Sequence, residues 1–190
     1  KIYPGRYSLN GISKIGDLVE KITTYPRTKR LTFIEGKEVK YYASILQDSL
    51  GVDSVRFIDL CLSDYVEKFS INAKSCEGYL YPDTYDFLIT YTEEQILDRL
   101  IQGFTDKTNQ TMQIYADSAE LPLSKHEIII LASIIQGETG ENSEMDTISS
   151  VYHNRLNKNM LLQADPTIQY IIPGKNRRLW NKDLKINKNL

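Results

Sequence analysis

Glu138 is the residue of this chain best placed for acid–base chemistry, because it closes the most apolar helical segment. Leu131 and Ile134 precede it at the spacing of one helical face, so its carboxyl projects from an apolar stripe. Gly137 and Gly140 indicate that the helix ends there. Apolar surroundings and the negative end of a helix dipole both favour the protonated carboxyl. Such a group could protonate a departing oxygen.

Two other interpretations of Glu138 stay open on position alone. The side chain could turn to water or pair with a cation such as Arg155. Alternatively, one of the nearby acids, Glu141, Glu144 or Asp146, could act with it as in a two-carboxylate glycosidase. The spacing indicates a different duty for Glu144 and Asp146, because they lie in the first turn of a following helix. Acids there are stabilised in their charged form.

That following helix and the strip after it carry further candidate binding groups. Glu144 and Arg155 fall on one continuous helical face and can bracket a single surface, and Tyr152 and Leu156 continue the apolar stripe beside it. The strip Leu162–Thr167 is extended and braced by a proline. Its hydrogen-bonding groups could bind a sugar or could stabilise a loop, and the sequence favours both interpretations equally.

A third candidate region is the aromatic segment Glu77–Phe87, in which large side chains surround a Pro-Asp turn. This pattern is typical of a strand or extended loop. Tyr79, Tyr81 and Tyr85 could stack on sugar faces, or they could be core tyrosines with satisfied hydroxyl groups. The sequence favours neither reading.

Two capping boxes predict the helices that position these residues. The first, Thr92–Gln95, opens a long helix that extends to about Tyr115 and has a structural role. The second, Ser124–Glu127, opens the helix that ends near Glu138. Because that helix is apolar on nearly every side, we expect it to be buried.

Residues 1–46 read as a small α+β unit that could display a binding surface. We expect a strand at 1–9, a Ser13-capped helix to Ile22, a strand at 30–34 and a helix at 39–46. The mixed pattern that follows is typical of a connector.

Composition narrows the class of protein. A net charge of -2 and a pI near 5.8 disfavour nucleic-acid binding. The apolar run 128–135 is far shorter than the roughly 20 residues that span a bilayer. His126 and His153 are isolated, so no metal site is predicted.

Cys61 and Cys76 permit one disulfide or two buried thiols, and we favour free thiols because two cysteines are too few to indicate a disulfide framework.

Three segments in order, Glu77–Tyr85, Leu131–Glu138 and Asn154–Thr167, resemble the endolytic murein transglycosylase family, of the membrane-anchored lytic transglycosylase G type. The resemblance covers most of the chain from Glu77 onward. More weakly, the amino-terminal unit resembles the family's LysM-like subdomain.

The resemblance implies that Glu138 is the catalytic acid and base. It would protonate the oxygen of the β-1,4 bond between N-acetylmuramic acid and N-acetylglucosamine, and then deprotonate the muramoyl 6-hydroxyl, which attacks C1. The product is a 1,6-anhydro end. Water is not a reactant, so neither a second carboxylate nor a cofactor is expected.

The expected fold is α+β, with a small LysM-like module packed on a mostly helical catalytic domain with few short strands. The expected divisions are a LysM-like subdomain at 1–46, a connector at 47–76 and a catalytic domain at 77–190, truncated at its C-terminus. The resemblance also implies a membrane anchor upstream and a place at the extracytoplasmic face of the bacterial cytoplasmic membrane. The expected partners are peptidoglycan glycan strands and cell-wall synthases.

The residues expected to bind substrate are Tyr81, Asp83, Thr84, Glu144, Asn154, Arg155, Gln163, Asp165 and Thr167. The rival hypothesis is a non-catalytic peptidoglycan-binding or cell-wall assembly protein of the same fold. A two-carboxylate hydrolase is the third possibility, and it predicts reducing ends instead of anhydro ends.

Overall fold

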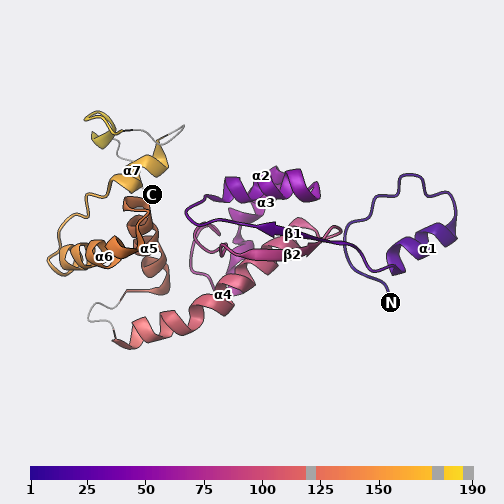
Figure 1. Ribbon diagram of the computed structural model, residues 1–190, viewed down its shortest axis with the longest axis horizontal. Helices are drawn as coiled ribbons and strands as arrows, with labels where there is room; N and C mark the ends of the chain where they lie inside the picture. Colours follow the sequence, from indigo (N-terminus) through magenta and orange to yellow (C-terminus); the bar gives the residue numbers. More distant parts are fainter. Residues whose placement is uncertain (119–122, 173–177, 186–190) are drawn as a thin grey trace. The chain divides into compact units, whose positions relative to one another are not determined.

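The computed structural model describes residues 1–118, 123–172 and 178–185. It is mixed helical with one two-stranded sheet, consistent with the expected α+β class (Figure 1). Its elements are α1 (Ile15–Thr23), β1 (Thr28–Thr32), α2 (Val39–Leu50), α3 (Ser54–Cys61), the 3-10 helix η1 (Asp64–Phe69), β2 (Thr84–Leu88), α4 (Glu93–Ser118), α5 (Lys125–Glu138), α6 (Asn142–Asn157), α7 (Asp165–Ile171) and the 3-10 helix η2 (Asp183–Lys185).

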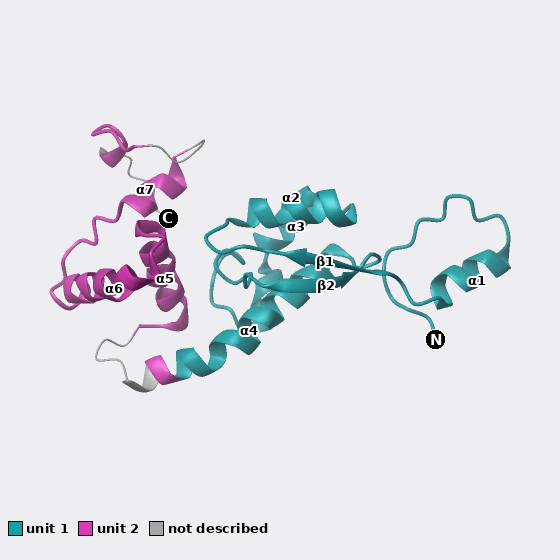
Figure 2. Ribbon diagram, viewed as in Figure 1, with its two compact units in different colours: residues 1–113 teal, residues 114–190 magenta. Residues whose placement is uncertain are grey.

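The chain divides into two compact units, residues 1–113 and 114–190 (Figure 2). The sequence instead predicted divisions after residues 46 and 76. The sheet explains the difference, because β1 pairs with β2 and so joins residues 28–32 to residues 84–88. Residues 1–46 therefore share their only described sheet with a segment far along the chain. Residues 1–9, predicted as a strand, form none.

Alternation along β1 and β2 creates one buried and one exposed face. Leu31 lies opposite Tyr85 and both are buried, whereas Arg30 lies opposite Asp86 on the exposed face. The Arg30 guanidinium donates two hydrogen bonds to the Asp86 carboxylate, at 2.9 and 3.0 Å. The period of two thus directs large apolar side chains inward and leaves a cross-strand ion pair in water.

Helices α2, α3 and α4 supply the rest of the first unit's core. Their fully buried side chains include Leu46, Phe57, Ile96 and Leu100, which share one core with Phe33 and Phe87 of the sheet region. Local signals set the helix ends. Gly51 ends α2 with the positive φ of 64° that glycine adopts without strain. The Thr92 capping box opens α4 as predicted, with reciprocal bonds to Gln95 of 2.9 and 3.4 Å.

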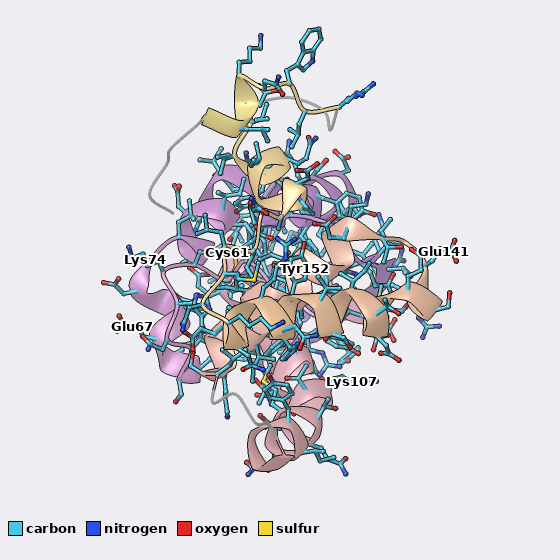
Figure 3. The ribbon with its side chains drawn as sticks, turned by 90° about the vertical axis from the view of Figure 1, so that its left-hand side faces the viewer. Cys61, Glu67, Lys74, Lys107, Glu141 and Tyr152 are labelled. Atoms are coloured by element: carbon cyan, nitrogen blue, oxygen red, sulfur yellow. A yellow bond between two sulfur atoms is a disulfide. The ribbon has the colours of Figure 1, made fainter. Side chains whose placement is uncertain are left out.

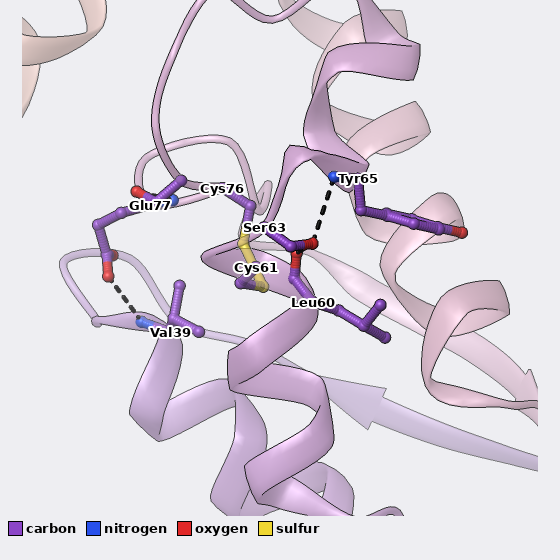
Figure 4. The surroundings of a disulfide bond; sticks show 8 residues. Val39, Leu60, Cys61, Ser63, Tyr65, Cys76 and Glu77 are labelled. Atoms are coloured by element: carbon purple, nitrogen blue, oxygen red, sulfur yellow. Dashed lines mark hydrogen bonds between the residues drawn. A yellow bond between two sulfur atoms is a disulfide. The ribbon is translucent and has the colours of Figure 1, made fainter.

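A disulfide joins Cys61, the last residue of α3, to Cys76 (Figure 4). The preference for free thiols was therefore wrong. The chain after α3 turns back so that the Cys76 amide donates to the Cys61 carbonyl at 2.8 Å, and the two Cα atoms lie 4.9 Å apart. Next to the disulfide, the Glu77 carboxylate accepts a hydrogen bond from the Val39 amide at 3.1 Å and so caps α2.

The second unit is built from α5, α6 and α7 around a small core. The predicted capping box opens α5, since Ser124 and Glu127 bond reciprocally. The buried side chains of this core are Leu131, Ile134, Tyr152 and Ala164. The expectation that α5 is buried was wrong: only Leu131 and Ile134 are buried on it, and Ile130 is 45% exposed. Along the described parts of the chain, no helix is both long and apolar enough to cross a membrane.

Candidate active site

Glu138 is the last residue of α5, as the flanking glycines predicted. Its side chain is exposed, whereas the sequence predicted a partly buried carboxyl. The reason is that α5 buries only the side of the helix that carries Leu131 and Ile134, so the apolar stripe does not enclose its own last turn. A neighbouring side chain, not burial, defines the surroundings of this carboxyl.

That neighbour is Tyr152, from the middle of α6. Its hydroxyl donates a hydrogen bond to Oε1 of Glu138 at 2.5 Å. The tyrosine is only 5% exposed (Figure 3, where it is labelled). Burial, and then the Glu138 carboxylate beside the hydroxyl, raise the pKa of Tyr152 well above its usual range. The phenol therefore stays protonated and remains a hydrogen-bond donor to Glu138.

The start of α7 packs against the end of α5 at a glycine. A Cβ at position 137 would lie 2.7 Å from the Cβ of Pro166, closer than side-chain carbons approach, so only glycine allows this contact. The residue before Glu138 thus touches the proline of the 162–167 strip. The structure brings this strip to the end of α5, next to the candidate acid. From Asp165 onward the strip is the first turn of α7, so the expectation of an extended chain was wrong for its second half.

Arg155 holds the same strip from α6. Its Nη1 atom donates to the carbonyls of Leu161 and Leu162, at 3.2 and 2.5 Å, and to Oε1 of Gln163 at 3.3 Å. Gln163 has a φ of 54°, a left-handed conformation that costs a non-glycine residue free energy. Arg155 therefore pins the strip, and the guanidinium is engaged there instead of pairing with Glu138.

The other predicted residues of this unit have distinct places. Glu144 accepts a hydrogen bond of 2.7 Å from the Thr139 hydroxyl, which ties the start of α6 to the end of α5. Asn154 and Asp165 are exposed, on α6 and at the start of α7. The Thr167 hydroxyl donates to the Ala164 carbonyl at 2.7 Å within the first turn of α7.

The predicted binding residues of the aromatic segment belong to the first unit. Tyr81 is half-buried, and Asp83 and Thr84 are exposed. The Thr84 hydroxyl bonds that of Thr32 across the sheet at 2.8 Å, and the Asp83 carboxylate lies 3.6 Å from the Lys107 ammonium. Their approach to Glu138 stays a prediction.

The sequence left open whether the tyrosines of that segment belong to the core or could stack on a sugar, and two of them can now be assigned. Tyr79 and Tyr85 are buried, so for them the core reading holds. The Tyr85 hydroxyl donates to the Tyr81 carbonyl at 2.8 Å, and burial raises the pKa of Tyr85 to about 12. Tyr81 retains accessible surface on which a sugar could stack.

Sequence reasoning missed Tyr152, Thr139 and the contact between Gly137 and Pro166. Tyr152 was placed only in the apolar stripe of α6. The signal that could have found it is its type: a buried tyrosine needs a partner for its hydroxyl, and Glu138 lies on the facing helix. Among the described residues no group of three or more His, Cys, Asp and Glu side chains could hold a metal ion.

The chain is similar to one protein family and to named bacterial proteins. The profile of the YceG-like family matches residues 1–189. A Bacillus subtilis protein named endolytic murein transglycosylase is 28% identical over 201 aligned residues, covering 96% of this chain and 55% of that protein. A Streptococcus pneumoniae protein of the same name is 29% identical over 94 residues, covering 50% of this chain and 16% of that protein.

The fold has a solved counterpart. The crystal structure of a protein described as yceG-like, from Listeria monocytogenes, superposes with a TM-score of 0.70 at 25% identity. The match covers 90% of this chain and 62% of that one. The chain thus spans about half the length of the Bacillus subtilis relative, at 55%, and somewhat more of the Listeria protein.

Proposed function

The chain belongs to the YceG-like family, and from that membership we propose that it carries the catalytic acid of a lytic transglycosylase that cleaves peptidoglycan glycan strands. The observation that carries the proposal is the carboxyl of Glu138, hydrogen-bonded by Tyr152 and adjacent to the contact between Gly137 and Pro166. The Glu138 carboxyl is exposed to a substrate there, and the hydrogen bond from Tyr152 holds it in place. The relatives named endolytic murein transglycosylase indicate the substrate class.

In the first step Glu138 gives its proton to the oxygen that joins C1 of N-acetylmuramic acid to N-acetylglucosamine. The C1–O bond breaks, and the N-acetylglucosamine unit leaves with that proton as its hydroxyl hydrogen. Positive charge develops at C1, and the newly formed carboxylate of Glu138 stabilises it.

In the second step the same carboxylate takes the proton of the muramoyl 6-hydroxyl. The 6-oxygen forms a bond to C1, which closes the 1,6-anhydro ring and returns Glu138 to its acid form. Atoms and protons balance without water. Because the side chain of Glu138 is exposed, a bound glycan can reach the carboxyl for both proton transfers.

We assign the remaining candidates supporting roles around the glycan. Gln163 and Asp165 offer oxygen atoms from the strip next to α5, and Arg155 keeps that strip in place. Glu144 fixes the junction of α5 and α6 through Thr139. The further substrate-binding residues in this proposal are Asn154 and Thr167 of the second unit and Tyr81, Asp83 and Thr84 of the first.

The proposal extends to residues 1–46, together with their sheet partner β2, as a LysM-like glycan-binding region of the first unit. It also extends to the extracytoplasmic face of the cytoplasmic membrane as the place of action. The disulfide between Cys61 and Cys76 supports that location, since disulfides persist mainly outside the reducing cytoplasm. Such a protein would be held there by a membrane anchor upstream of this chain and would work beside cell-wall synthases on nascent strands.

Product analysis tests the proposed function. The whole protein is incubated with purified, uncrosslinked glycan strands, and mass spectrometry identifies the new chain ends. We expect 1,6-anhydro-N-acetylmuramic acid ends. Reducing ends would instead indicate a hydrolase, and binding without new ends would indicate the non-catalytic alternative; either result would overturn the proposal.

A further inference from the structure

The contact between Tyr152 and Glu138 has a direction that matters for proton transfer. The phenol has one hydrogen, and it points to Oε1 of Glu138 at 2.5 Å. Oε1 is therefore an acceptor in this pair. When Glu138 carries its own proton, that proton occupies Oε2, because Oε1 already accepts the tyrosine hydrogen.

The ring of Tyr152 is fixed independently of the site. It is only 5% exposed and belongs to the buried cluster with Leu131, Ile134 and Ala164. These residues come from α5 and from the residue just before α7, so the hydroxyl cannot move away unless the core of the second unit opens. A side chain held in this way can position a mobile one.

We propose that Tyr152 is a positioning residue that holds Oε1 of Glu138 as an acceptor, so that Oε2 alone gives and takes the proton. The inference rests on the proposed function of Glu138. In each cycle Oε2 loses its proton to the glycosidic oxygen and regains one from the 6-hydroxyl. Tyr152 keeps its own proton throughout and takes no part in the proton transfers.

Three charged groups face the Tyr152 hydroxyl, and together with burial they keep the phenol protonated. Glu138 comes from α5, Arg155 from α6 and Asp165 from α7. The two carboxylates raise the pKa of the phenol and Arg155 lowers it, while burial, the largest influence, raises it. The phenol thus remains protonated near neutral pH, and it donates to both forms of Glu138.

Tyr152→Phe tests the inference, because phenylalanine keeps the ring in the core and removes only the hydroxyl. A hydrogen bond to a charged group contributes enough that kcat should fall roughly 10- to 100-fold, with KM nearly unchanged. The hydroxyl stabilises the carboxylate more than the acid. Its loss should therefore move the alkaline limb of the pH–rate profile to higher pH.

Tyr115→Phe is the matched control. Its hydroxyl lies 3.0 Å from Nε2 of His153 in the same unit, so the change removes a phenol contact that does not involve Glu138. This variant should keep the parent kcat and pH profile. A melting temperature close to that of the parent would verify that the ring of Tyr152→Phe still packs.

The outcomes separate this inference from the proposed function. If Glu138→Gln is inactive but Tyr152→Phe keeps the parent kcat and pH profile, the positioning role is wrong and the catalytic acid stands. A fall in kcat without a pH shift would assign Tyr152 a packing role and also overturn the inference. If Glu138→Gln cleaves at the parent rate, the proposed function fails and the inference fails with it. In the double variant, Tyr152→Phe should cause no further loss beyond Glu138→Gln.

Discussion

The two compact units are stabilised in different ways. The first unit encloses a broad aromatic and aliphatic core that includes Phe33, Phe57 and Phe87, and a disulfide fastens its connector. The second unit buries only a small cluster, and the first helix of that unit exposes apolar surface, including Ile130. Burial stabilises the first unit, whereas polar contacts between helices contribute a larger share in the second.

The difference bears on the candidate site, because Glu138 lies in the less enclosed unit. Its position depends on Tyr152, on Thr139 through Glu144, and on the approach of Pro166 to Gly137. Regions with few buried contacts open more readily than large cores. We therefore expect the second unit to be locally less stable than the first, and its geometry to respond to smaller changes.

The largest expected effect on stability comes from the first core. Phe57 is fully buried, so Phe57→Ala should lower the free energy of unfolding by about 3–5 kcal/mol. Leu131→Ala in the second unit should cost about 2 kcal/mol, since a small cluster can collapse around the gap. Denaturant unfolding with hydrogen exchange on each unit would measure both. A larger cost for Leu131→Ala would contradict the comparison.

Loss of the disulfide is the next largest effect. The cysteines are 15 residues apart, and closing a loop of that length contributes about 3 kcal/mol. Cys61→Ala with Cys76→Ala should lower the melting temperature of the first unit and leave hydrogen exchange in α5 and α6 unchanged. Equal losses of protection in both units would show that they do not unfold separately.

Gly137→Ala probes the contact between α5 and α7. The added methyl group would overlap Pro166, so we expect a loss of about 1–3 kcal/mol confined to the second unit, together with reduced cleavage. Gly140→Ala is the control, because nothing lies within 4 Å of a Cβ at that position. If both variants behave alike, the close approach at Gly137 does not hold the site.

The smallest predicted effect concerns the start of α5. Ser124 caps this helix, and Ser124→Ala should destabilise the second unit by about 1 kcal/mol. Ser133→Ala, at an exposed position within the same helix, should be neutral or slightly stabilising, since alanine favours the helix interior. Hydrogen exchange of the first turn of α5 distinguishes the two.

Local sequence signals predicted the ends of individual helices well. Capping boxes at Thr92 and Ser124 located the starts of α4 and α5, and Gly137 and Gly140 located the end of α5. These patterns act within a few residues, so one sequence contains all the information they need.

Contacts between distant segments were predicted poorly. Nothing near β1 shows that its partner is β2, so the division after residue 46 differed from the observed one. The disulfide needed the chain after Cys61 to turn back, and spacing alone does not reveal that. An apolar helix predicts burial only if enough partners surround it, and α5 leaves Ile130 exposed.

At the candidate site, the sequence identified residue types but not their partners. Arg155 was predicted to bracket a binding surface, and it binds the backbone of residues 161–162. Tyr152 was assigned to an apolar stripe, and its hydroxyl contacts Glu138. A side chain that is apolar along its body and polar at its tip satisfies a hydrophobic pattern while it serves another purpose.

The central claim is that one carboxyl, that of Glu138, both gives and takes the proton. The most direct test compares Glu138→Gln with Glu141→Gln, a change at a nearby exposed acid at the N-terminus of α6, in the release of 1,6-anhydro ends from glycan strands. Glutamine keeps the size of the side chain and can still accept the Tyr152 hydrogen bond, but it transfers no proton. We expect Glu138→Gln to lower the rate by about 10²–10⁴-fold with fold and glycan binding retained, and Glu141→Gln to cleave at the parent rate. Anhydro ends released by Glu138→Gln at the parent rate would contradict the account.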